Sequence, residues 1–169
     1  MTERAVPLAP HATLGGAILL AAWLGAAIFF AAVVARAAFQ ALPTRALAGA
    51  LVGATLPALF LSGAAVGVAA ALAAWRPSVA TARGARLAGA FALAVSCALG
   101  QFAIGPRIDR LRSSLGTSLE TLAPTDPSRI AFGRLHALSV LALAVAMIGA
   151  LVGLAGAYLA LRASHPPPP

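Results

Sequence analysis

Four long apolar segments restrict the fold of this chain more than any other feature. They run over about residues 13–35, 46–75, 86–104 and 130–161. A helix rising 1.5 Å per residue needs roughly 20 residues to cross about 30 Å of hydrocarbon, and each segment is close to or above that length. We therefore predict an all-α integral membrane protein with four transmembrane helices.

The composition supports a membrane location and argues against nucleic acid as a partner. Apolar residues make up 61% of the 169 residues and charged residues only 9%, whereas about a quarter of the residues in soluble domains are charged. The net charge of +8 comes from arginine alone. Because the arginines stand singly at the ends of apolar runs, they suit anionic lipid head groups better than a nucleic acid.

The lengths of the connections predict the topology. The first connection, about residues 36–45, and the second, about 76–84, are short, so consecutive spans should run antiparallel in an up-down-up-down bundle. Residues 1–162 then form a single four-helix domain, and residues 163–169 form a proline-rich tail.

The third connection is longer and has a helical pattern of its own. Apolar residues recur every three or four positions along one face, at Ile108, Leu111, Leu115, Leu119 and Leu122. This pattern predicts an interfacial amphipathic helix over about 107–122, between the third and fourth spans. A solvated loop is the alternative. Asp126 or Ser128 should cap the start of the fourth span.

Polar residues gather between Gly105 and Ser139, which hold three of the four acidic residues and five of the twelve arginines. Asp109 stands among Arg107, Arg110 and Arg112, so we expect it to be ionised and paired with arginine. These four residues form a candidate surface for docking lipid phosphates or a protein partner. No second carboxylate completes a catalytic pair, and no nucleophile or phosphate-loop motif is present. We therefore expect no enzymatic activity and no catalytic residue.

His136 is the histidine that falls inside a span, which makes it a candidate functional residue. It could ligate one porphyrin-type pigment or haem alone, but no second histidine lies at a matching depth for a bis-histidine haem. Packing through a hydrogen bond to Ser139, Asp109 or a carbonyl is the favoured interpretation. The single cysteine, Cys97, excludes an internal disulfide and a thiolate metal cluster, and we expect it to be buried. No cofactor or metal is predicted otherwise.

Glycines line one face of the second span and one face of the fourth. Small residues at such spacings let membrane helices approach closely. We expect the two faces to pack on each other within one chain, in preference to a seam between two copies. The candidate packing glycines are Gly49, Gly53, Gly63, Gly67, Gly149, Gly153 and Gly156.

Three stretches resemble the transmembrane protein 205-like family of small four-helix membrane proteins, whose bacterial members carry a domain of unknown function. They are Trp23-Leu24-Gly25 to Phe39-Gln40-Ala41-Leu42-Pro43, Gly105-Pro106-Arg107-Ile108 to Leu111-Arg112, and Phe132-Gly133-Arg134-Leu135-His136 to Ser139. The resemblance covers about residues 14–155 and implies a four-helix fold without an established reaction. Arg36 and Ala142 replace a proline and an asparagine that are usual in the family.

Two functional hypotheses follow. The first is a non-catalytic accessory or stabilising subunit that packs in the bilayer against other membrane proteins. The second is a small membrane carrier, or a single-histidine metal- or pigment-binding protein that uses His136.

The resemblance implies a bacterial cytoplasmic (inner) membrane. Seven of the twelve arginines fall on the side away from the termini, so the positive-inside rule places the termini outside the cytoplasm.

Overall fold

The computed structural model describes residues 8–75, 80–115 and 121–164, and every regular element in these ranges is helical. In chain order they are α1 (Leu8–Phe29), the π-helix η1 (Phe30–Val34), α2 (Ala35–Ala41), α3 (Arg45–Ala74), α4 (Ala80–Ala98), the π-helix η2 (Leu99–Ile104), α5 (Gly105–Leu115) and α6 (Pro127–Ser164). They build four spans that are long and apolar enough to cross a membrane: His11–Ala41, Arg45–Ala74, Ala82–Leu115 and Pro127–Ser164. The predicted all-α fold with four transmembrane helices is confirmed.

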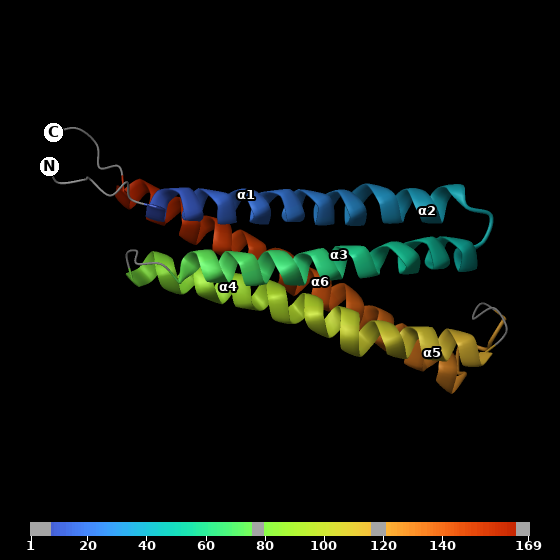
Figure 1. Ribbon diagram of the computed structural model, residues 1–169. Helices are drawn as coiled ribbons and strands as arrows, with labels where there is room; N and C mark the ends of the chain where they lie inside the picture. The colour runs from blue at the N-terminus through green and yellow to red at the C-terminus, as the bar shows by residue number, and fades with distance from the viewer. Residues whose placement is uncertain (1–7, 76–79, 116–120, 165–169) are drawn as a thin grey trace, which may run out of the picture.

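The four spans form an up-down-up-down bundle in which each span packs against two neighbours. α4 lies between α3 and α6, and α1 packs on the other side of the same two helices. Figure 1 shows that α1 begins and α6 ends at the same end of the bundle. α3 and α6 are therefore diagonal to each other, and they meet only marginally.

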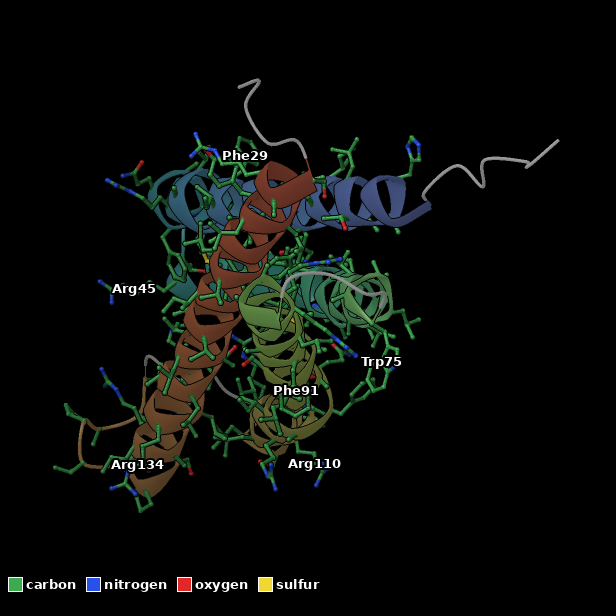
Figure 2. All side chains as sticks on the ribbon, turned by 90° about the vertical axis from the view of Figure 1, so that its left-hand side faces the viewer. Phe29, Arg45, Trp75, Phe91, Arg110 and Arg134 are labelled. Carbon is green, nitrogen blue, oxygen red and sulfur yellow. The ribbon has the colours of Figure 1, made fainter. Side chains whose placement is uncertain are left out.

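Large apolar side chains cover the outside of the bundle, as expected where lipid replaces water. Phe29, Trp75 and Phe91 are 59%, 71% and 68% exposed, and Figure 2 shows all three directed away from the helices. An apolar surface of this extent marks a membrane interaction site. The protein is thus a multi-pass membrane protein in contact with the lipid bilayer.

Side-chain caps fix the starts of α3 and α6. The Thr44 hydroxyl accepts a hydrogen bond from the Leu47 N–H at 3.2 Å, at the start of α3. Because α2 continues to Ala41, the first connection consists of residues 42–44 instead of the predicted 36–45. Asp126 precedes α6 and accepts a bond from the Ser128 N–H at 2.7 Å. Pro127 occupies the first helical position, where no N–H is needed. Of the two predicted caps, Asp126 and Ser128, the structure has Asp126.

The polar helix after the third span differs from its predicted form. α5 starts at Gly105 and continues from α4 through η2, so Ala82–Leu115 is one span of 34 residues. The described helical part of the predicted segment, residues 107–115, is consequently an extension of the third span instead of a separate helix. Residues 121–126 are not helical, and residues 116–120 lie outside the described ranges. The apolar-to-polar change at Gly105 alters the surface of the helix without interrupting its backbone.

The core joins α1, α3 and α4 around Trp23. Its indole N–H donates to the Leu59 carbonyl at 3.0 Å in a buried position. Gly63 makes room for this ring, because an added Cβ would lie 2.7 Å from Trp23 Cε2. Cys97 packs at the same place with 0% exposure, which confirms that it is a buried residue.

The predicted contact between the glycine faces of the second and fourth spans is wrong, because α4 separates them. A Cβ on Gly67 of α3 would lie 2.7 Å from the Ala94 nitrogen of α4. On α6, a Cβ on Gly149 would lie 2.8 Å from the Gly89 carbonyl oxygen, also in α4. Gly67 of the α3 face and Gly149 of the α6 face thus pack on α4, whose own Gly89 completes the contact with α6. Gly153 lies against Leu20, and Gly156 lies against Arg86.

Candidate functional site

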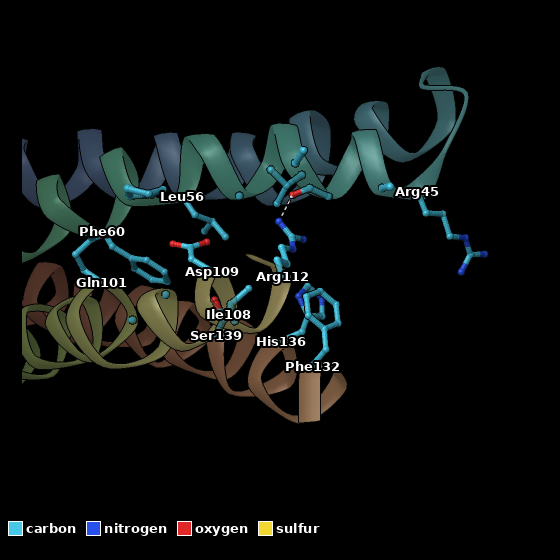
Figure 3. A pocket seen from close by; sticks show the side chains of 18 of the residues that line it. Arg45, Leu56, Phe60, Gln101, Ile108, Asp109, Arg112, Phe132, His136 and Ser139 are labelled. Carbon is cyan, nitrogen blue, oxygen red and sulfur yellow. Dashed lines mark hydrogen bonds between the residues drawn. The ribbon is translucent and has the colours of Figure 1, made fainter. Parts of the chain in front are cut away.

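A cavity of about 490 Å³ lies at the end of the bundle away from the described chain ends. α3 forms one side, and η2, α5 and the start of α6 form the other. Figure 1 shows α3 diverging from α5 toward this end. The two sides differ in chemistry, as Figure 3 illustrates: α3 contributes mainly apolar groups, whereas the other side contributes most of the polar ones.

The α3 wall is apolar apart from Arg45 at the start of the helix and exposed backbone. Val52, Leu56 and Phe60 supply side chains to it. Pro57 also lines the cavity, and because proline has no N–H, the Gly53 carbonyl one turn earlier lacks its usual helical donor. The Thr55 hydroxyl reaches the Val52 carbonyl at 3.0 Å and not that of Gly53. This wall therefore offers hydrocarbon contacts and one backbone acceptor.

Arg112 crosses the cavity from α5 to α3. One guanidinium nitrogen donates to the Gly49 carbonyl at 3.3 Å, and the guanidinium carbon lies 5.2 Å from the centre of the Phe132 ring of α6. A Cβ on Gly49 or Gly53 would lie 3.0 or 3.1 Å from this guanidinium. The two glycines, predicted as helix-packing positions, thus accommodate an arginine side chain.

Asp109 lies one turn before Arg112 and, like it, points toward α3 (Figure 3). The two residues are three positions apart, a spacing at which side chains can meet. Nevertheless Asp109 makes no ion pair or hydrogen bond with another described residue, so the predicted pairing with arginine is wrong. The reason is that Arg112 is turned to the Gly49 carbonyl and the Phe132 ring.

His136 also lines the cavity but does not make the predicted packing hydrogen bond. It stacks on Phe132 one turn earlier in α6, with ring centres 6.2 Å apart and planes 7° apart. It forms no hydrogen bond to Ser139, Asp109 or any other described residue. Nor do the described residues include a group of three His, Cys, Asp or Glu side chains that could hold a metal ion. Single-histidine ligation of a pigment remains an untested prediction.

Two further polar side chains face the cavity without a partner in the described chain. Ser139 is 6% exposed, and Gln101 belongs to η2; both line the cavity, and neither makes a hydrogen bond to another described residue. A buried polar group normally has a partner, so the buried Ser139 hydroxyl and the partly buried Gln101 amide are both open to water or a ligand. Gln101 was missed by sequence reasoning, although an amide inside an apolar span is a visible signal. The π-helix around it was not predictable, and such segments are frequent at functional sites.

The electrostatics of the cavity favour a negatively charged group near its outer end. Arg45, Arg112 and Arg129 line it against a single carboxylate, that of Asp109. Arg129 also donates to the Leu122 carbonyl at 2.7 Å. α3 and α6 begin at this end, whereas α2 and the described part of α5 end there, so the helix dipoles add no net preference and the arginines carry the argument. Sequence reasoning missed Arg45 and Arg129, because it did not bring the first turns of two distant helices together.

The remaining predicted polar residues lie outside the cavity. Arg107 is exposed and bonds the Ala103 carbonyl of its own helix at 2.8 Å. Arg110 is exposed as well, and it points outward in Figure 2. At the opposite end of the bundle, Arg86 is 6% exposed and donates to the Ala73 carbonyl near the end of α3 at 2.9 Å. Docking of lipid or protein at Arg107 and Arg110 stays a prediction.

Comparison with known proteins gives a family without an assigned activity. No curated protein and no solved structure matches the chain significantly. One family model matches residues 18–117, which include α3, η2 and α5 of the cavity wall, and its description is a domain of unknown function, DUF4149. Because the match covers more than half of the chain, this multi-pass membrane protein belongs to the DUF4149 family.

Proposed function

We propose that the protein binds one membrane-embedded amphiphile with a phosphate-type head group in the cavity between α3, α5 and α6. The observation that carries the proposal is the set of polar side chains without a partner in the described chain, Gln101, Asp109 and Ser139, opposite an apolar wall. An amphiphile complements both surfaces at once. Its polar group satisfies the unpaired groups, and its hydrocarbon lies along Leu56 and Phe60.

The size and charge of the cavity support this choice of ligand. Small-molecule sites usually enclose about 300–1,000 Å³, so a volume of about 490 Å³ fits a head group with the adjoining part of a chain. Of the unpaired polar groups, Ser139 is buried and Gln101 is partly buried, and a buried polar group without a partner costs about 1–3 kcal/mol. Three arginines against one carboxylate favour an anionic group, to which guanidinium groups bind well.

Ligand-dependent stability tests the proposal. A ligand that binds only the folded protein stabilises it by about 2.7 kcal/mol at 100 times its dissociation constant. Added phospholipid should therefore raise the unfolding temperature of detergent-purified wild type. Ala50→Phe should abolish the rise, because Ala50 is exposed and lines the cavity, whereas Ala54→Phe should keep it, because Ala54 is exposed on α3 outside the cavity. Equal responses in both variants would refute cavity binding.

An accessory-subunit role is the second candidate. Arg107 and Arg110 favour it, because both are exposed and neither lines the cavity, so their guanidinium groups are available to a partner's acidic groups. Purification in a mild detergent tests this role: a stoichiometric partner supports it, and a lone monodisperse chain of 16.7 kDa counts against it.

The finer assignments made from the sequence are also proposals. They are membership of the transmembrane protein 205-like family, a bacterial inner-membrane location with the termini outside the cytoplasm, and the absence of catalysis. The alternative of a pigment on His136 is tested by the absorption spectrum and metal content of wild type and His136→Ala. A band or metal that disappears in the variant would favour pigment binding over a lipid-type ligand.

A further inference from the structure

We infer that Asp109 recognises the ammonium of a zwitterionic phospholipid head group, while Arg112 and Arg129 hold its phosphate. This inference deepens the proposed function and rests on it. It starts from an unusual feature of α5: a carboxylate and a guanidinium one turn apart, both directed to the same cavity, do not pair with each other.

The contacts of Arg112 explain why the Asp109 carboxylate is left open. The guanidinium is held by the Gly49 carbonyl on one side and by the face of Phe132 on the other. Gly49 and Gly53 have no side chains that would displace it. An ionised carboxylate has about four acceptor positions, and those of Asp109 have no donor within the described chain.

The position of Asp109 makes a cationic ligand group favourable. Arg112 lies against Gly49 and Gly53, and Asp109 is one turn farther from the end of the bundle, level with Leu56 (Figure 3). At 1.5 Å per residue this level is roughly 17 Å along α3 from its start at Arg45. Asp109 is exposed where it lines this open cavity, and Arg107 and Arg110, which flank it in α5, are exposed as well, so its carboxylate lies where a polar head group can reach it. A ligand ammonium would neutralise it through a charge-assisted hydrogen bond.

The arginines are placed to hold the phosphate of the same ligand. A guanidinium has five N–H donors, and the contact of Arg112 with Gly49 uses one, as does that of Arg129 with Leu122. Residues three apart on a helix are separated by roughly 5–6 Å at Cβ. A two-carbon spacer between phosphate and ammonium, as in an ethanolamine head group, has a comparable reach. The unpaired hydroxyl of Ser139 and amide of Gln101 remain for the other head-group oxygens.

Binding of phospholipids with identical acyl chains and different head groups tests this assignment. Beyond the shared phosphate, the head group of phosphatidylethanolamine supplies a positive charge and N–H donors. That of phosphatidylcholine supplies a positive charge without donors, and that of phosphatidylglycerol supplies hydroxyl donors without a positive charge. Wild type should bind phosphatidylethanolamine about tenfold or more tightly than either of the others, because a hydrogen bond between charged groups is lost with each. The preference must overcome the general attraction of the arginines for anionic phosphatidylglycerol.

Asp109→Asn isolates the role of the carboxylate. It should reduce the preference for phosphatidylethanolamine over phosphatidylglycerol to about one while phosphatidylglycerol still binds. Asp126→Asn is the matched control, because it removes a carboxylate at the same end of the bundle, outside the cavity, and asparagine caps a helix as well as aspartate does. It should keep the wild-type preference.

The outcomes separate this inference from the proposed function. Equal affinity of wild type for the three phospholipids, or an unchanged preference in Asp109→Asn, would overturn the role of Asp109 and leave amphiphile binding intact. Failure of every phospholipid to bind wild type saturably would instead overturn the proposed function together with the inference.

Discussion

Gly89→Ala should separate α4 from α6, the two helices with the most extensive contact in the bundle. An added Cβ would lie 2.5 Å from the Gly149 carbonyl oxygen and 2.8 Å from the Gly153 Cα. Both atoms belong to the backbone of α6, so no flexible side chain can move aside. The whole helix must shift to accept one methyl group.

The magnitude follows from two opposing effects. Overpacking a well-packed contact costs about 1–3 kcal/mol, while replacing glycine by alanine within a helix gains about 0.5–1 kcal/mol. Gly84→Ala in the same helix is the matched control, because nothing lies within 4 Å of its added Cβ. It should show the gain alone. The difference in unfolding free energy between the two variants should therefore equal the overpacking cost of about 1–3 kcal/mol.

Cys97 provides the assay. It is the single cysteine of the chain and is 0% exposed, so a thiol-reactive fluorophore should label it only after unfolding. For a chain of this length 1 kcal/mol corresponds to about 2–4 °C in the midpoint. Gly89→Ala in a mild detergent should thus become labelled several degrees below Gly84→Ala. Coincident labelling curves would refute the close contact between α4 and α6.

Three further changes are predicted to have distinct effects. Trp23→Phe should lower the unfolding free energy by about 1 kcal/mol through loss of the indole bond to Leu59, measured by the same labelling; an unchanged midpoint would contradict the buried bond. Asp126→Ala should cost about 1 kcal/mol and Asp126→Asn only a few tenths, because asparagine also caps α6; equal losses would argue against the cap. Gly53→Ala should leave the labelling temperature close to that of wild type but weaken phospholipid binding, since the new Cβ meets the movable Arg112 side chain; unchanged affinity would argue against a role of Arg112 in binding.

The sequence predicts those parts of the fold that depend on local pattern. The length of each apolar run is enough to locate the four spans, because crossing the hydrocarbon requires only about 20 consecutive apolar residues. The Asp126 cap follows from residue type and position alone. The packing of glycines is different, because which helix a glycine faces depends on the arrangement of all four spans. The patterns of α3 and α6 did not show that α4 is the neighbour of both.

The candidate site was predictable only in part. His136, Asp109 and Arg112 were singled out from the sequence, and the structure brings them to one cavity. The charge count around Asp109 predicted an ion pair with arginine, but it carries no information on side-chain direction. The Arg112 guanidinium is drawn to α3 by contacts 63 residues away in the chain. Gln101 and Arg45 line the same cavity because η2 and the start of α3, distant in the sequence, lie around it.

The central claim is that one amphiphile occupies the cavity, and counting phospholipids on each chain tests it most directly. Native mass spectrometry after extraction into a mild detergent should show wild type and Ala54→Phe with one retained phospholipid. Ala50→Phe, which fills the cavity from α3, should retain none. Equal retention in all three proteins, or no retained phospholipid on wild type, would contradict the claim.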